Sequence, residues 1–428
     1  MAAEDAAPRL LTSPPHLDDE SFWESREVLR HIRDGAYANI ASPWHILALA
    51  MEGAIQQIPY STEIRTDRDY GVHANFAAVL YGRTGSGKSS AQHLIRRLFE
   101  WGRDYRPIGI RSGEGIVDSY GEWEDVTVPA VGGAAATTTR VFKWSNPEHA
   151  KAFLFDEVTD FTAKSDRSGS TLKGTILSMI TCSTIGGVRA GGRNSTIPAG
   201  TYRATLVVGA QPGRCETLLS AEDQARGTPG RFLWARAGLS RSDKDRVARV
   251  RESRKDAPEK VRVGLLDWPA VMGIDEQIRK DLEEFGLEYA MGDSAVDPID
   301  GHRGVNTLKT AAALAVLDGR TYVTEDDWDL SRYLWSVSDE VRSEAVEAQY
   351  AAMTERADEK GRERALSDRA ENDFKRRVDE YTRRALEKGF LPGSKPVGEP
   401  WKKFRAMFSK TTRPVYMQAV IREMHWDE

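Results

Sequence analysis

Residues 76–89 read Phe76-Ala-Ala-Val-Leu-Tyr-Gly82-Arg-Thr-Gly-Ser-Gly-Lys88-Ser89, a short apolar run that leads into a glycine-rich loop. The apolar run predicts a buried strand, and the residues after Ser89 have the apolar spacing of a helix. The loop matches G-x-x-x-x-G-K-[ST], in which glycines let the backbone curl until several N–H groups point at one anion. Strand, loop and helix in this order predict a phosphate-binding loop that faces the helix N-terminus.

This loop predicts a site for a nucleoside triphosphate and a magnesium ion. Lys88 would reach the β- and γ-phosphates, and the Ser89 hydroxyl would ligate Mg²⁺. The other residues that we expect to bind ATP are Gly82, Arg83, Thr84, Gly85, Ser86, Gly87 and Ser90. We expect ATP rather than GTP, because the sequence contains no Asn-Lys-x-Asp motif for reading guanine.

Length and composition indicate a multidomain protein of the cytoplasm. A chain of 428 residues is expected to form two or three domains, and 40% hydrophobic with 29% charged residues is ordinary for a globular protein. We see no apolar run near the roughly 18 residues that cross a membrane, and no signal peptide at the N-terminus. Cys182 and Cys215 cannot form a metal cluster by themselves. The net charge of −5 means that any contact with nucleic acid depends on local basic surfaces.

Short apolar runs between helical segments predict an α/β fold, a parallel sheet flanked by helices, over residues 71–240. The expected strands are 76–81, 107–110, 139–144, 152–155 and 204–209. A flexible tail (1–21) and a helical segment (22–70) are expected before this core. A charged linker or helix (241–264), a helical domain (265–350) and a charged helix with a small winged-helix-like module (351–428) are expected after it.

The run Phe153-Leu-Phe-Asp156-Glu157 is an apolar strand that ends in two carboxylates. We expect this strand beside the strand of the loop, where Asp156 would hold the hydration shell of Mg²⁺. Glu157 would position and activate the attacking water, because phosphoryl transfer depends on positioning and charge neutralisation. A strand that ends in acids by chance is the alternative. A glutamate directly after the aspartate favours hydrolysis over a simple nucleotide switch.

Two further polar residues follow in the same order along the chain. Gln211 ends the run Thr205-Leu-Val-Val-Gly-Ala-Gln211-Pro-Gly213, and Arg231 lies in Gly227-Thr-Pro-Gly-Arg231-Phe. Taken alone, Gln211 is equally well a turn residue and Arg231 a surface charge.

With these motifs in order, the sequence resembles the AAA+ ATPases, and among them the pre-sensor-1 hairpin clade that includes the minichromosome-maintenance helicases. The resemblance implies that Gln211 is the sensor that reaches the γ-phosphate or the lytic water, although the helicases have Asn there. It implies that Arg231 is an arginine finger that completes the site of a neighbouring subunit, and hence a homo-oligomer such as a hexameric ring.

The same clade places a β-hairpin before this sensor, directed into the pore of the ring. Residues 185–203 have two strand-like arms around a Gly-Gly-Arg-Asn turn. Arg189 and Arg193 would contact DNA phosphates, which gives affinity without reading sequence. The alternative is a surface hairpin with solubilising arginines.

Most of the chain is also similar to a narrower family, the replication ATPases of actinobacterial phages, plasmids and chromosomal islands. The similar strings include Phe22-Trp-Glu24, Pro43-Trp44, Ser112-Gly-Glu-Gly115, Leu317-Asp-Gly-Arg320 and Asp327-Trp328. This resemblance implies a replication-associated motor, with a primase-polymerase as a partner.

Three positions keep two interpretations each. The resemblance implies that 265–350 is an AAA+ lid in which Arg303 is the second sensor, but a solvent-facing arginine at a helix start fits equally well. Glu114 could approach the nucleotide or DNA, or it could be a carboxylate favoured by a helix N-terminus. The aromatic residues after Phe390 lie among basic ones and could contact DNA or form the core of their module.

The leading hypothesis is an oligomeric ATPase that moves on single-stranded or forked DNA as a replicative helicase. A loader or initiator that binds DNA without unwinding it shares every nucleotide motif, and a remodeller of protein complexes is the third candidate.

Overall fold

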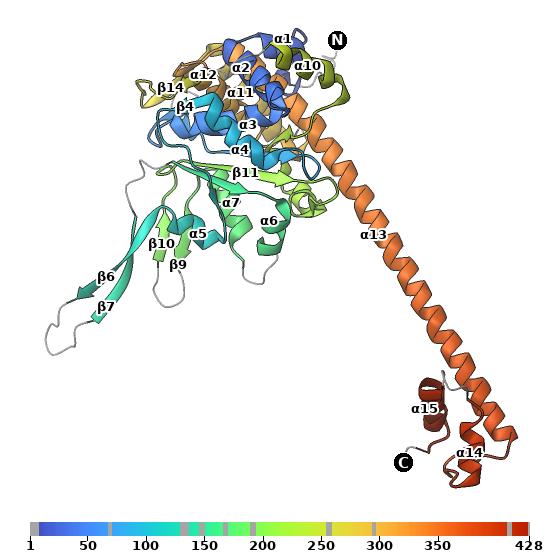
Figure 1. Cartoon of the computed structure of the whole chain (residues 1–428). Coiled ribbons are helices and arrows are strands. Elements are labelled where there is room, and N and C mark those ends of the chain that lie inside the picture. Colours follow the sequence, from blue (N-terminus) through green and yellow to red (C-terminus); the bar gives the residue numbers. More distant parts are fainter. Residues whose placement is uncertain are drawn as a thin grey trace. The chain divides into compact units, whose positions relative to one another are not determined.

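The computed structural model describes residues 8–66, 71–128, 137–144, 150–165, 170–188, 194–253, 259–292, 297–408 and 413–426. The chain divides into two compact units, Met1–Ala351 and Ala352–Glu428, whose elements are labelled in Figure 1. The first unit contains the glycine-rich loop and all the strands among the described residues.

The core of the first unit is a sheet of five parallel strands in the order β12-β3-β11-β8-β5. The strands are β3 (Phe76–Tyr81), β5 (Ile108–Gly109), β8 (Lys151–Phe155), β11 (Ala204–Ala210) and β12 (Leu233–Arg236). Helices flank this sheet, which confirms the predicted α/β fold. Because the strands are parallel, the residues that follow each of them lie along one edge, here called the carboxyl edge.

The two faces of the sheet are covered by different helices, and β3 shows why. Ala78 and Leu80 pack in one core with α3 (Pro43–Gln57) and α4 (Lys88–Leu98). Val79 and Tyr81 pack in a second core with α6 (Val158–Ser165) and α7 (Leu172–Ile180). Alternate residues of a strand point to opposite faces, so a fully apolar strand is buried on both sides. Figure 1 shows these helix pairs on either side of β11.

Two expectations about the sheet are wrong. Strand β8, which carries the acidic pair, is not the neighbour of β3, because β11 pairs with both of them. The order of parallel strands depends on how the crossovers wind, which chain order does not reveal. Residues 139–144 are not in this sheet: they belong to β7 (Thr137–Trp144), which pairs antiparallel with β6 (Gly121–Val128). The sheet takes β12 instead, a strand that the sequence analysis missed.

Two β-hairpins extend from one region of the first unit (Figure 1). One is β6–β7, and the other pairs β9 (Ile185–Val188) with β10 (Asn194–Ile197), which confirms the two predicted arms. Both contact α5 (Gly113–Asp118), and β10 contacts β7.

The N-terminal residues and the predicted lid form one body with the sheet. Leu10 is buried and the Arg332 Nη2 donates to the Thr12 carbonyl at 2.7 Å, so 8–21 is not a free tail. The elements of this body are η1 (Arg9–Leu11), α1 (Asp19–Glu24), α2 (Glu27–Ala38), α11 (Glu276–Met291), α12 (Arg303–Leu317) and the first part of α13 (Glu325–Glu387). Helix α12 packs on α3, and both contribute to one hydrophobic core.

Smaller elements join this body. A four-stranded sheet contains β1 (Glu63–Arg65), β2 (Gly71–Val72), β14 (Val271–Ile274) and β15 (Tyr322–Val323), and a second pair is β4 (Phe99–Trp101) with β13 (Val261–Val263). The short helices are α8 (Glu216–Leu219), α9 (Ala221–Ala225), η2 (Pro229–Arg231), η3 (Arg241–Asp243) and η4 (Pro298–Asp300). Helix α10 (Lys244–Ser253) contacts α2, so 241–264 holds a packed helix and a strand.

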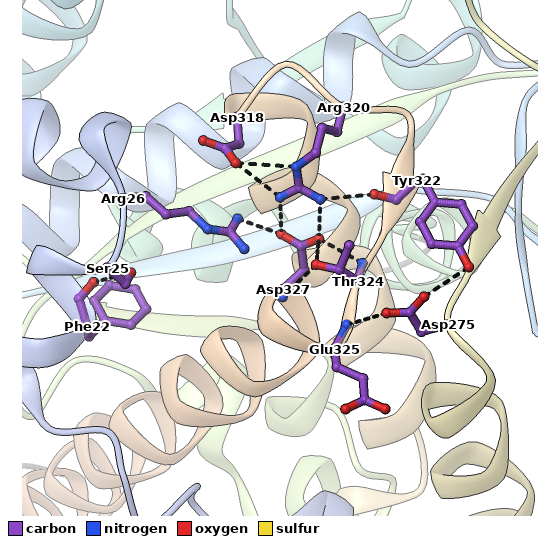
Figure 2. Close-up of polar contacts among 10 residues, drawn as sticks. All are labelled: Phe22, Ser25, Arg26, Asp275, Asp318, Arg320, Tyr322, Thr324, Glu325 and Asp327. Atoms are coloured by element: carbon purple, nitrogen blue, oxygen red, sulfur yellow. Dashed lines mark hydrogen bonds and ion pairs between the residues drawn. The ribbon is translucent and has the colours of Figure 1, made fainter.

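A buried carboxylate joins the N-terminal helices to the predicted lid (Figure 2). Asp327 is fully buried and accepts from the Arg26 Nη1 at 2.5 Å and from both Arg320 Nη atoms at 2.7 and 2.8 Å. The backbone N–H and hydroxyl of Thr324 also donate to it. Burial alone would raise the pKa of Asp327, but these partners lower it below its usual value.

The second unit is helical in its described part. It contains the rest of α13, α14 (Glu399–Arg405) and α15 (Arg413–Glu423), and no strand occurs among its described residues, so a wing is not seen there. Phe404, Phe408 and Trp426 are buried together, which supports the core interpretation of these aromatic residues. Nowhere in the described chain is a helix long and apolar enough to cross a membrane.

Candidate nucleotide-binding site

The glycine-rich loop connects β3 to α4 at the carboxyl edge of the sheet. Gly85 and Gly87 have φ angles of 79° and 81°, which only glycine adopts without strain. Gly87 is the residue before α4, so the loop ends at a helix N-terminus whose N–H groups have no partner within the helix. A curled backbone and a helix N-terminus are the two features that bind phosphate.

Lys88 folds back over the loop. Its Nζ donates to the carbonyls of Gly82 and Arg83 at 3.0 and 3.1 Å. Burial lowers the pKa of Lys88, and the nearby Glu157 opposes this shift. The ammonium group therefore lies against the loop, near the carboxylate of Glu157, which follows β8.

A chain of hydrogen bonds connects the ends of three adjacent strands. The Thr84 hydroxyl, in the loop after β3, donates to the Gln211 Oε1 at 3.0 Å. The Gln211 Nε2, after β11, donates to the Glu157 Oε1 at 2.8 Å, after β8. The insertion of β11 between β3 and β8 is what puts an amide between the loop and the acid.

The ends of β8 and β11 approach closely beside this chain. A Cβ atom at Gly209 would lie 2.1 Å from the Asp156 carbonyl oxygen and 3.5 Å from the Lys88 Cδ. A side chain at 209 would therefore push the acidic pair away from the loop. Asp156 is exposed and Glu157 is half-buried.

The residues at this edge suit a nucleotide-bound magnesium ion better than a metal held by protein alone. Among the described residues, no group of three or more His, Cys, Asp or Glu side chains is arranged to hold a metal. Mg²⁺ bound with phosphates needs only one or two protein ligands and keeps several waters. Asp156 meets this requirement. Ser89 is the second residue of α4, but its side chain lies outside the described part of the structure.

Of the other predicted site residues, Arg231 lies away from this edge. Arg231 precedes β12, whose residues pair with β3 from Ala78 onward, so it lies at the opposite, amino edge of the sheet. Its Nη2 lies 2.7 Å from the His302 Nε2, and its Nη1 donates to the Arg226 carbonyl at 3.3 Å. Arg231 therefore does not serve this chain's own loop. Arg189 and Arg193 lie outside the described residues.

Arg303 is held inside the first unit. It is 3% exposed, donates to Asp300 at 2.7 Å and Asp339 at 2.5 Å, and lies 4.8 Å over the ring of Trp335. None of these partners belongs to the loop. This placement gives the second-sensor prediction no support and assigns Arg303 a structural role, because a buried cation needs carboxylate partners.

Sequence reasoning missed His45 of α3. Its ring is fully buried, neither ring nitrogen has a hydrogen-bond partner, and burial together with the charge of Lys88 lowers its pKa to about 3. The apolar sequence of α3 gives no signal that His45 comes near the charge of Lys88. At Glu114, the second residue of α5, the carboxylate accepts from the Thr171 hydroxyl at 2.9 Å.

No protein-family model matches the sequence, and no curated protein matches it.

Proposed function

We propose that the protein hydrolyses ATP at the carboxyl edge of its parallel sheet and works as an oligomeric, DNA-dependent motor. The observation that carries the proposal is the hydrogen-bonded chain Thr84–Gln211–Glu157 beside Lys88. It brings an amide and an acid beside the glycine-rich loop, and hydrolysis of a terminal phosphate uses such groups to position water and to sense the phosphate.

The loop and the first turn of α4 supply the binding part of this proposal. Their N–H groups would cradle the phosphates, and the Lys88 ammonium would move from the loop carbonyls to the β- and γ-phosphates. Ser89 and Asp156 would hold Mg²⁺, which when bound neutralises charge on the phosphates.

Glu157 and Gln211 supply the chemical part. Glu157 would accept a proton from the attacking water while holding it in line with the γ-phosphate. Gln211 would donate its amide N–H either to Glu157 or to the phosphate, so that it reports on the presence of the terminal phosphate. In the structure this N–H is donated to Glu157.

The oligomeric part of the proposal rests on Arg231. Its position at the amino edge is the one expected of a group that completes the site of a neighbouring copy rather than its own. The hairpins β6–β7 and β9–β10 extend near each other. In the proposed motor, both hairpins would contact the substrate that moves through the assembly.

A remodeller of protein complexes is the second candidate, and the β6–β7 hairpin favours it. Its described exposed side chains include Glu122, Glu124 and Asp125 but only Arg140 and Lys143 as cations, and Val126 and Val141 are also exposed. Such a surface suits a protein partner better than a phosphate backbone.

ATP turnover by the variant Glu157→Gln tests the proposal. The amide keeps the size and the bond to Gln211 but cannot take the proton, so we expect turnover to fall by about 100-fold or more while ATP still binds. Glu216→Gln, an exposed acid of α8 near the same edge, is the matched control and should keep full turnover. Unchanged turnover in Glu157→Gln would contradict the proposed chemistry.

A further inference from the structure

A cavity that is lined by several basic residues lies at the amino edge of the sheet, away from the loop. It has a volume of about 290 Å³. Its lining comes from β2, the end of α7, η2 and the start of α12, and its titratable members are His73, Arg231, His302 and Lys309. Among the described residues no carboxylate lines it, and the Glu63 Oε1 lies 3.5 Å from the His73 Nε2.

Two buried cations near this cavity lack a carboxylate partner in the described part of the chain. Lys309 is 4% exposed, and its Nζ donates to the Ile180 carbonyl at 3.0 Å. Behind it Arg203 is fully buried, with its Nη2 donating to the carbonyls of Pro59 and Thr62. Among the described residues neither cation forms an ion pair with a carboxylate, although buried charges normally have one.

Arg231 is only partly satisfied at the mouth of this cavity. Its Nε is buried and has no hydrogen-bond partner. Its Nη2 donates to the His302 Nε2, which requires a neutral imidazole with the proton on Nδ1. Burial, Arg231 and Lys309 lower the pKa of His302 to about 4, which keeps that ring neutral near pH 7.

We infer that this cavity binds a phosphate group, held by Arg231 and Lys309. A tetrahedral dianion fits the volume, takes the unpartnered Nε of Arg231 and compensates the buried cations. His302 is a positioning residue, which holds the guanidinium at the mouth through its neutral ring. The inference depends on the proposed function only for the source of the phosphate, which is either the terminal phosphate of ATP in a neighbouring copy or free inorganic phosphate.

Thermal unfolding of the full chain with inorganic phosphate tests the binding. All proteins carry Lys88→Ala, which removes phosphate binding at the glycine-rich loop, and sodium chloride matches the ionic strength. We expect a saturable rise in Tm, because a ligand that binds only the folded state stabilises it. Adding Arg231→Gln should weaken the apparent affinity by at least about tenfold, which corresponds to the loss of one charged hydrogen-bonding partner.

Two more double variants keep this test decisive. Arg226→Gln removes an exposed arginine that pairs with Glu222 nearby, and it should leave the phosphate effect unchanged. Lys309→Gln keeps a donor for the Ile180 carbonyl but removes the charge, and it should weaken binding as Arg231→Gln does. Equal phosphate affinity in Lys88→Ala and Lys88→Ala/Arg231→Gln overturns the inference, whether or not the protein hydrolyses ATP.

A mixing experiment identifies the source of the phosphate. Lys88→Ala subunits keep Arg231 but lack ATP binding, and Arg231→Gln subunits bind ATP but lack the arginine. If the cavity takes the terminal phosphate of a neighbour, mixing the two inactive proteins restores part of the ATP turnover. If turnover stays absent while phosphate binding persists, the ligand is free phosphate.

Discussion

At the scale of single residues, Gln211 connects the glycine-rich loop to Glu157, the acid that we propose activates the attacking water. Its amide has one acceptor and one donating group, and the chain uses both, with Thr84 and Glu157. An amide can turn its N–H from a carboxylate to a phosphate without changing charge. The loss of a terminal phosphate would therefore change the hydrogen bond from Gln211 to Glu157.

The variants Gln211→Ala and Thr84→Val test this connection. We expect Gln211→Ala to reduce ATP turnover by about 10-fold to 100-fold and to leave ATP affinity nearly unchanged, because the amide acts on the terminal phosphate and not on the base. Thr84→Val, which only frees the Gln211 oxygen, should have a smaller effect. A double-mutant cycle on turnover measures the coupling, and additive effects would contradict a shared chain.

Glu52 gives a prediction about pH. Its carboxylate is fully buried, where the hydroxyls of Tyr105 and Thr205 donate to it, and burial raises its pKa to about 7 from the usual 4.5. The folded state holds this proton more tightly than the unfolded state. The contribution of Glu52 to the free energy of unfolding is therefore complete below pH 4.5 and is lost as the pH rises to 7.

Urea unfolding of the wild type and of Glu52→Gln at pH 5.5 and pH 8 measures this effect. The variant cannot ionise, so its stability relative to the wild type should rise with pH by up to about 1.4 kcal/mol per pH unit within that window. The same difference in unfolding free energy at both pH values would mean that the pKa of Glu52 is not raised in the folded protein.

At the scale of elements, the Asp327 network fixes the N-terminal helices to the predicted lid. Arg26 comes from the segment that leads into α2, whereas Arg320 and Thr324 precede α13 (Figure 2). These segments are about 300 residues apart in the chain. The buried Asp327 carboxylate thus joins the N-terminal helices to the start of α13.

The variant Asp327→Asn should lower the free energy of unfolding by about 2–3 kcal/mol, because the half-buried Arg26 loses its charge partner, whereas Arg320 keeps Asp318 as a second partner. Asp326→Asn, its exposed neighbour, is the control and should change stability little. Chemical denaturation measures both. A loss below about 1 kcal/mol, the value of a surface pair, would show that the network is not needed for folding.

The elements also show what the sequence could predict. The loop and the acidic pair follow from local patterns, because a strand, a turn and its polar end are contiguous in the chain. The position of β11 between β3 and β8 depends on long crossovers, which no local pattern specifies. The run 137–144 has the pattern of a strand, but this pattern does not say whether the strand joins the parallel sheet or pairs with 121–128. The cavity of Arg231, His302 and Lys309 joins segments that no local pattern relates.

At the scale of the whole molecule, the residues of both proposals lie in the first unit. The loop, the acids and the cavity beside Arg231 all belong to Met1–Ala351. Within it the bond from the Cys215 N–H to the Gln349 Oε1, at 2.8 Å, ties the segment after Gln211 to α13. The unit Ala352–Glu428 has its own core around Phe404.

A chain that ends at residue 360 therefore should bind ATP as the full chain does, since it keeps the first unit and the turns of α13 that support Gln349. Fluorescent-nucleotide titration compares the two proteins, and Lys88→Ala in the short chain gives the background. Loss of ATP binding on truncation would show that the second unit is needed to form the site.

The central claim is that ATP is hydrolysed at the carboxyl edge of the sheet. Its most direct test is phosphate release from ATP and Mg²⁺ by the full chain, compared with Lys88→Ala under the same conditions and with single-stranded DNA added to each. We expect steady turnover by the wild type that DNA stimulates, and turnover at background level in Lys88→Ala. Equal phosphate release from the two proteins, or ATP binding by the wild type without any release, would contradict it.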